Sequence, residues 1–199
     1  MSAQTPSGAG HEVGLENGWL VMVRHTAVHE NLRGVCYGAS DVDLSASGLA
    51  HIDRLATELA ALAPSLIVHS GLSRARRLAE SIGSRLARKP RMDPRIAEFN
   101  FGEWELRRWD DIHSAGHDIA RLIHEPESFA PPGGETVLAM RDRVLEWYAG
   151  LPRRTRVLAV SHGGPISALQ GSLSAAPPAT WPSLVPGYGQ AVRVDLPSS

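Results

Sequence analysis

The chain contains two kinds of hydrophobic pattern, and the first is typical of strands. Uninterrupted apolar runs lie within residues 20–26, 65–69 and 157–162, as in strands that are buried on both faces of a sheet. Residues 189–195 alternate between polar and apolar and predict a last edge strand, and residues 91–93 predict a short one. The pattern therefore predicts three buried strands and two strands at the edges.

The second pattern, between these runs, has apolar residues every three or four positions, as on the buried face of a helix. Ser45 is the expected N-cap of the first helix, and Pro64 ends it. The apolar stripe of this helix comprises Leu49, Ile52, Leu55, Leu59 and Leu62. A second helix opens within residues 70–77 and turns Ala75, Leu78, Ile82 and Leu86 inward. A third, after a loop at 131–134, turns Val137, Met140, Val144 and Trp147 inward.

Length, charge and cysteine content narrow the classes of function. The chain has 199 residues, which fits one domain, and a net charge of −1, which does not favour nucleic acid or acidic membranes as partners. No apolar run reaches the length of a membrane span. The single cysteine, Cys36, fits a reducing compartment, and we expect a cytoplasmic protein. Residues 1–14 are expected to form a disordered tail, which leaves residues 15–199 for the domain.

Two of the buried runs end in a histidine. The first ends in Arg24 and His25, and the third ends in His162, followed by two glycines and by Pro165 at the expected first position of a helix that continues through residues 166–174. Arginine binds phosphate or carboxylate oxygens, and a glycine-rich turn before a helix favours an anion. Ligands of open α/β sheets bind beyond the carboxyl ends of the strands. We therefore expect both histidines in one pocket, although the first stretch alone could equally be a solvated strand end.

Two known chemistries must be tested in the long polar segment after the first strand. Asp41 and Asp43 have the spacing of the aspartate pair in haloacid-dehalogenase-type phosphatases, but that pair should end a hydrophobic strand, and residues 36–40 do not form one. Cys36 could be a thiolate nucleophile, but the arginine that a cysteine phosphatase loop needs six positions later is Val42 here. We interpret the aspartate match as fortuitous and Cys36 as a small apolar residue.

Two further side chains, Arg74 and Glu98, fit a site that binds an anion and transfers a proton. Of three arginines that open the second helix, Arg74 lies closest to the strand end and is the one expected to face an anion. Glu98 lies among aromatic residues, where desolvation favours the protonated form that a general acid needs, although composition alone fits a surface glutamate. His113 and His117 have the spacing of a metal-binding pair, but Gly116 weakens that helix and a solvated pair is the simpler interpretation.

From Trp19 to about Leu173, the chain contains four motifs whose order and spacing resemble those of the histidine phosphatase superfamily, the phosphoglycerate-mutase-like group. Together they form a much more specific signal than any one of them. The first motif, Arg24-His25-Thr26, matches the family's Arg-His-Gly, and Asn31 matches the asparagine that follows in the same loop. The second, Ser70-Gly-Leu-Ser-Arg74-Ala75, matches the family's Ser-Pro-Leu-x-Arg-Ala element. The third is Glu98, which matches the glutamate before Phe-Gly-x-Trp-Glu, and the fourth is His162-Gly163, which matches the late His-Gly.

The chain departs from the family pattern in three places. Residues 26–28, Thr-Ala-Val, replace Gly-Glu-Thr, which could alter the phosphate-binding loop. Gly71 replaces a proline, and Leu106 stands where glycine is usual. None of these changes removes a catalytic group. Residues 34–44 and 101–112 look most like the α-ribazole phosphatase subgroup of cobalamin biosynthesis, which often has threonine after the first histidine.

The resemblance implies a fold and a mechanism. The fold is α/β, a three-layer α/β/α sandwich with a mostly parallel central sheet, in which about residues 94–133 form a partly helical excursion over the active site. His25 attacks phosphorus, His162 stabilises the transition state, and Glu98 donates a proton to the leaving alcohol and then activates water, with neither metal nor cofactor. Arg24 and Arg74 complete the catalytic set. The residues expected to bind phosphate or substrate are Arg24, Thr26, Asn31, Arg74, His162 and Gly163.

Three functions stay open. The first is a metal-independent phosphomonoesterase that acts through a phosphohistidine on a small metabolite, with α-ribazole phosphate as one candidate. The second is a mutase or a phosphatase of another metabolite, although the chain is short for a mutase. The third is a catalytically silent module that binds a phospho-ligand, against which the intact catalytic set argues. The expected partner is a small phosphate ester, not nucleic acid or a membrane, and the oligomeric state is open, a homodimer included.

Overall fold

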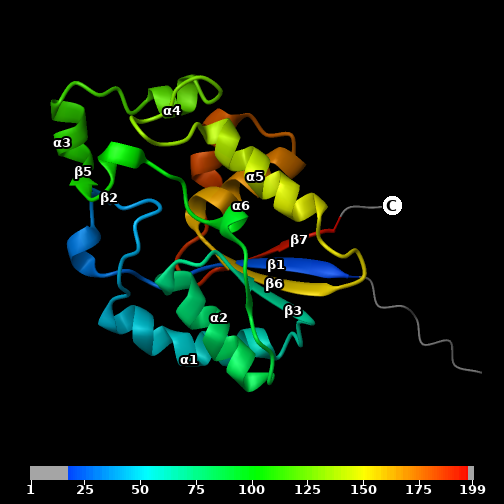
Figure 1. The fold of residues 1–199 in the computed structure, drawn as a ribbon. Helices are drawn as coiled ribbons and strands as arrows, with labels where there is room; N and C mark the ends of the chain where they lie inside the picture. The colour runs from blue at the N-terminus through cyan, green and yellow to red at the C-terminus, as the bar shows by residue number, and fades with distance from the viewer. Residues whose placement is uncertain (1–17, 197–199) are drawn as a thin grey trace, which may run out of the picture.

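A five-stranded sheet runs through the centre of the computed structural model, which describes residues 18–196 (Figure 1). The predicted tail at 1–14 lies outside these residues. The strand order is β4-β3-β6-β1-β7, with every neighbouring pair parallel except β1 and β7. The predicted strands are confirmed, including those at both edges. The strands of this sheet are β1 (Trp19–Arg24), β3 (Leu66–His69), β4 (Arg91–Met92), β6 (Arg156–Ser161) and β7 (Ala191–Val194).

Helices cover both faces of the sheet, which makes the predicted three-layer sandwich (Figure 1). Successive side chains of a strand point to opposite faces, so Leu20 and Met22 of β1 pack into one core while Val21 and Val23 pack into the other. The first core is closed by α5 (Val137–Ala149) and α6 (Gly163–Leu173), and the second by α1 (Ala46–Ala60) and α2 (Ser73–Arg85).

A segment of short elements lies outside the sandwich and forms the predicted excursion. Cys36 of β2 packs with Trp104 and Ile112 in a small separate core, and β2 pairs with β5 in an antiparallel ribbon.

No helix within residues 18–196 has the length and apolar character needed to cross a bilayer. The short elements of the molecule are η1 (Glu30–Leu32), β2 (Val35–Cys36), η2 (Pro94–Ile96), η3 (Gly102–Trp104), β5 (Arg107–Arg108), α3 (Trp109–Ser114), α4 (Arg121–His124) and η4 (Pro178–Leu184).

Two details of the predicted helices are wrong. Leu49 and Leu62 were expected to face the core, but each is 44% exposed. The buried stripe of α1 is narrow, centred on Leu55 and Leu59, and Leu62 lies beyond the last residue of the helix. In α6 the N-cap is His162, so Pro165 stands at the third helical position instead of the first. Proline is tolerated there because N–H groups of the first turn have no partner within the helix.

Candidate active site

The ends of neighbouring parallel strands bring the two predicted histidines together. His25 follows β1 and His162 follows β6, and these strands pair in parallel with Arg24 beside Ser161. Both imidazoles are buried, and their ring centroids lie 5.1 Å apart. The two strand ends therefore bring the two histidines side by side at this edge of the sheet.

His25 is held as a neutral imidazole with a free lone pair. Its Nδ1 lies 2.7 Å from the carbonyl oxygen of Thr26, so Nδ1 carries the proton and donates it, which leaves Nε2 unprotonated. Within residues 18–196, Nε2 is buried without a hydrogen-bond partner. Burial, with the positive charges of Arg74 and Arg24, lowers the pKa of His25 to about 3. These are the properties of a nucleophile or a base.

His162 is oriented through its other nitrogen. Its Nε2 lies 2.7 Å from the hydroxyl oxygen of Ser70, at the end of β3. When this hydroxyl donates to Nε2, Nδ1 carries the proton and can donate to an anion. Burial first, and then His25 and Arg74, hold the pKa of His162 well below its usual value, so the ring is neutral. Ser70 belongs to a matched motif, but its contact to His162 was not predicted, since it joins two distant strand ends.

Two guanidinium groups supply positive charge beside the histidines. Arg24 donates to the carbonyl oxygen of Pro186 at 2.8 Å and lies over the ring of Tyr188, 4.1 Å from its centroid. Arg74 is fully buried and donates to two carbonyl oxygens of the loop at 38–40, at distances of 2.6 and 2.7 Å. The choice of Arg74 among the three arginines that open α2 agrees with its burial.

Several buried polar atoms converge on this cluster with no hydrogen-bond partner among the described residues. Folded proteins pair nearly all such atoms, and those left over mark a functional site or a ligand. A phosphoryl group, with its acceptor oxygens and its negative charge, would satisfy the donors in this set. The unpaired atoms are Arg24 Nε, His25 Nε2, Thr26 Oγ1, Arg74 Nε and His162 Nδ1.

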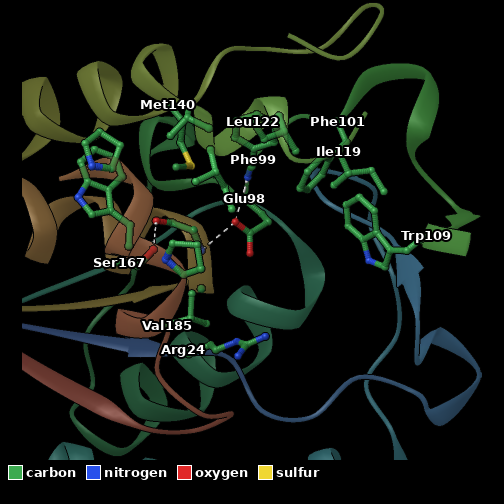
Figure 2. A pocket seen from close by; sticks show the side chains of 17 residues that line it. Arg24, Glu98, Phe99, Phe101, Trp109, Ile119, Leu122, Met140, Ser167 and Val185 are labelled. Carbon is green, nitrogen blue, oxygen red and sulfur yellow. Dashed lines mark hydrogen bonds between the residues drawn. The ribbon is translucent and has the colours of Figure 1, made fainter. Parts of the chain in front are cut away.

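Glu98 lies beside the first turn of α6 and is held by backbone N–H groups. Its Oε1 accepts hydrogen bonds from the N–H groups of Phe99 at 3.0 Å and Gly164 at 3.1 Å (Figure 2). The approach depends on glycine, because a Cβ at position 164 would lie 2.5 Å from Oε1. Burial raises the pKa of Glu98, against the lowering effect of its hydrogen bonds and of Arg74. The N–H of Gly164, which belongs to the glycine-rich turn expected to favour an anion, is thus bonded to Glu98.

The remaining predicted site residues lie in different places. Thr26 is buried beside His25, and a Cβ at Gly163 would lie 3.6 Å from the guanidinium carbon of Arg24. Asn31 lies exposed in η1, where its backbone N–H donates to His29 Nδ1. No contact in the described part of the chain connects Asn31 to the cluster, so its role stays a prediction.

The alternative phosphatase chemistries have no support in the geometry. Asp41 accepts hydrogen bonds from both the N–H and the hydroxyl of Ser73, each at 2.7 Å, and so caps α2. The carboxylate of Asp43 is exposed and 3.9 Å from Arg77. Cys36 is buried, and burial raises the pKa of its thiol to about 12, so it is unreactive near neutral pH.

The histidine pair of the excursion does not form a metal site. His113 is in the last turn of α3, whereas His117 follows the helix end and stacks on Trp104, with 5.4 Å between ring centroids. Gly116, with φ of 86°, ends the helix between them. Within residues 18–196, no group of three histidine, cysteine, aspartate or glutamate side chains is arranged to hold a metal ion.

Two departures from the family pattern have a backbone basis. Gly71 has φ of 99°, which proline cannot adopt, so this turn differs from one built on proline. Leu106 has φ of 63°, a left-handed conformation that glycine adopts without cost. Glycine at position 106 would therefore suit the same backbone.

A pocket of about 550 Å³ opens beside the histidines. Arg24, Gly163 and Glu98 line it, and the first two are the chain neighbours of His25 and His162. Most of the other lining side chains are apolar, and they come from the excursion and from the region of α5, α6 and η4. A phosphate bound at the histidines would therefore have its ester group in this pocket.

Comparison with known proteins agrees with this geometry. The family model described as "Histidine phosphatase superfamily (branch 1)" matches residues 20–197. The chain therefore belongs to the histidine phosphatase superfamily, and it is a phosphatase, a hydrolase of phosphomonoesters. The family resemblance drawn from the motifs is confirmed.

Individual relatives differ in the substrate their names give. The chain is 33% identical to a glucosyl-3-phosphoglycerate phosphatase of Mycolicibacterium vanbaalenii, over 89% of this chain and 83% of that protein. It is 31% identical to a probable phosphoglycerate mutase GpmB of Escherichia fergusonii, over 78% and 74%. The structure of an alpha-ribazole phosphatase from Shigella flexneri superposes with a TM-score of 0.78 at 25% identity, over 89% and 90%.

Proposed function

We propose that this histidine phosphatase hydrolyses small-molecule phosphate esters through a covalent phosphohistidine on His25, without a metal ion. The observation that carries the proposal is the free, buried Nε2 of a neutral His25, beside two guanidinium groups. A neutral imidazole is a nucleophile, and fixed cations stabilise charge on a transferring phosphoryl group. The protein cations therefore do the work that metal ions do in other phosphatases.

The reaction proceeds in two chemical steps. In the first, Nε2 of His25 forms a bond to phosphorus while the bond from phosphorus to the ester oxygen breaks, and Glu98 gives its proton to that oxygen. Arg24, Arg74 and the Nδ1–H of His162 stabilise the phosphoryl oxygens. In the second step the Glu98 carboxylate takes a proton from water, whose oxygen attacks phosphorus as the bond to His25 breaks.

For the substrate, we propose α-ribazole phosphate as the first candidate. The superposition with an alpha-ribazole phosphatase supports it, as does the apolar lining of the pocket, which suits an aromatic base. Glucosyl-3-phosphoglycerate is the competing candidate, supported by the relatives that carry this name. A panel that contains both esters and 3-phosphoglycerate tests these candidates. Released phosphate identifies which ester a phosphatase hydrolyses, and isomerised product identifies a mutase.

The mechanism is tested with the full-length protein in EDTA and a generic aryl phosphate. We expect turnover to persist, and an acid-labile, base-stable phosphate label to appear on His25 after rapid quenching. His25→Ala should lose both turnover and label while keeping its fold, because no second nucleophile is available. A strict magnesium requirement, or label on Asp41 or Cys36, would overturn the proposal.

A further inference from the structure

The pocket beyond Glu98 has apolar walls on several sides (Figure 2). Figure 2 shows the Glu98 carboxylate near the middle, with Met140 and Leu122 above it, Ile119 and Trp109 to one side, and Arg24 below. Ile123 of α4 belongs to the same lining. Another part of the lining comes from η4 and the residue after it, with Pro178, Trp181, Pro182 and Val185.

Few polar side chains line this pocket, and two of them already donate their hydrogen atoms within the protein. Among the described residues, the charged side chains that line the pocket are Arg24 and Glu98, and both belong to the proposed chemistry. The Ser167 hydroxyl donates to the carbonyl oxygen of Gly164 at 3.0 Å. The indole N–H of Trp181 donates to the carbonyl oxygen of Ala176 at 2.9 Å. Among the described residues, the indole N–H of Trp109 is the remaining polar side-chain group of the lining, so a group with several hydroxyls or a carboxylate that packs against these walls would be desolvated with little compensation.

We propose that the substrates are phosphomonoesters whose leaving alcohol places an aliphatic or aromatic group in this pocket, in preference to alcohols that place a hexose or a carboxylate there. This inference rests on the proposed function, since it assigns the pocket to the leaving alcohol. The volume of about 550 Å³ suits an organic group of metabolite size. It favours α-ribazole phosphate, which carries an aromatic ring system, over glucosyl-3-phosphoglycerate, which carries a hexose and a carboxylate.

A series of primary alkyl phosphates from methyl to hexyl tests the proposal, because the leaving oxygen has nearly the same basicity in all of them. We expect kcat/KM to rise along the series, by up to about 4-fold for each CH₂ group that the pocket buries. An ester of the same length as hexyl phosphate that ends in a carboxylate should react at least ~10-fold more slowly than hexyl phosphate, because its charge must be desolvated.

A variant of the wall gives a second test. Ile123 lines the pocket and is 37% exposed, so Ile123→Lys should fold. The added ammonium should reduce the ratio of hexyl to methyl turnover and raise the relative rate of the carboxylate-ended ester. Leu62→Lys is the matched control, because Leu62 is 44% exposed at the end of α1, on the other face of the sheet. It should keep the wild-type preferences.

The outcomes separate this inference from the proposed function. Turnover with no dependence on chain length, or a carboxylate-ended ester that matches hexyl phosphate, overturns the apolar specificity and leaves the phosphohistidine mechanism intact. Failure to hydrolyse any ester of the series or any aryl phosphate overturns both. A rising series that Ile123→Lys flattens and Leu62→Lys preserves supports the apolar pocket as the specificity site.

Discussion

At the residue scale, the two central histidines are distinguished by which nitrogen the protein uses. Nδ1 of His25 donates to a backbone carbonyl, so its free atom, Nε2, has a lone pair. Nε2 of His162 is paired with Ser70, so its free atom is Nδ1. Two neighbouring imidazoles of low pKa can thus take different roles, one as nucleophile and the other as hydrogen-bond donor.

Glu98→Gln should slow phosphoryl transfer in a way that depends on the leaving group. An alkoxide is a poor leaving group and needs a proton, and general acid catalysis typically contributes about 10²–10⁴-fold. The loss should fall in this range for an alkyl phosphate and be much smaller for a nitrophenyl phosphate. Single-turnover kinetics is the measurement to use, because Glu98 also acts in the later hydrolysis step.

Equal losses for the two esters in the transfer step would contradict this role. Glu98 would then only shape the pocket. His162 or a bound water would become the next proton donor to test.

The sequence allowed the main members of the cluster to be predicted, because each follows a strand or opens a helix with a recognisable pattern. His25 and His162 each follow a buried apolar run, and Arg74 begins α2. The contacts of Tyr188 with Arg24 and of Ser70 with His162 had no such signal. They depend on the packing of segments that are far apart in the chain.

At the element scale, α5 fixes the segment that carries Glu98. Arg143 donates to the carbonyl oxygens of Arg95 at 2.7 Å, Ala97 at 2.8 Å and Glu98 at 3.1 Å. Its guanidinium also pairs with Glu135 at 2.7 Å, and both side chains are largely buried. Residues 97–101 contain neither helix nor strand, so these bonds replace the ladder that a regular element would provide.

Arg143→Met should therefore reduce both stability and activity. The variant leaves three carbonyl oxygens and a carboxylate without their charged donor, which should lower the free energy of unfolding by about 2–4 kcal/mol. Urea denaturation measures this loss. For the folded fraction, kcat/KM with an alkyl phosphate should fall more than with a nitrophenyl phosphate, because Glu98 is displaced.

Arg141→Met on the same helix is the control. Arg141 is paired with its exposed neighbour Asp142, so its loss should change the free energy of unfolding by no more than about 0.5 kcal/mol. If the two substitutions destabilise the protein equally, the loss comes from removing any arginine of α5, and Arg143 has no specific role.

Among the elements, those with a long periodic pattern were predicted and the short ones were not. α2 and α5 bury Leu78, Ile82, Val144 and Trp147, as their spacing indicated. The ribbon of β2 and β5 has two residues in each strand, too few to show any period. The pocket walls were likewise not predictable, since they combine α4 and η4, which lie on different parts of the chain.

At the scale of the whole molecule, the sandwich holds a cluster of ionisable groups in its interior. His25 and His162 are buried as neutral rings beside Arg74, which is itself fully buried. The unfolded chain has no such restriction, so its histidines titrate near their usual pKa of about 6.5. Protonation at low pH therefore favours the unfolded chain.

The stability of the protein should consequently fall as the pH is lowered from about 6.5 towards 3. In this interval the unfolded chain binds protons that the folded His25, with its pKa of about 3, does not bind. Each such histidine contributes a slope of about 1.4 kcal/mol per pH unit, with stability rising as pH rises. Glu98 has the opposite sign, because its raised pKa gives stability at low pH that is lost as pH increases through that pKa.

Since the pKa values of the buried His25, His162 and His69 are lowered and that of Glu98 is raised, we expect a net loss of stability on acidification, and His25→Asn isolates one contribution. Asparagine can still donate a hydrogen bond to the Thr26 carbonyl, but it does not titrate. Urea unfolding between pH 4.5 and 7 should give this variant a slope up to about 1.4 kcal/mol per pH unit shallower than that of the wild type. Parallel profiles for His25→Asn and the wild type would mean that His25 titrates in the folded protein as it does in the unfolded chain, and that the fold does not hold it as a neutral imidazole below pH 6.5.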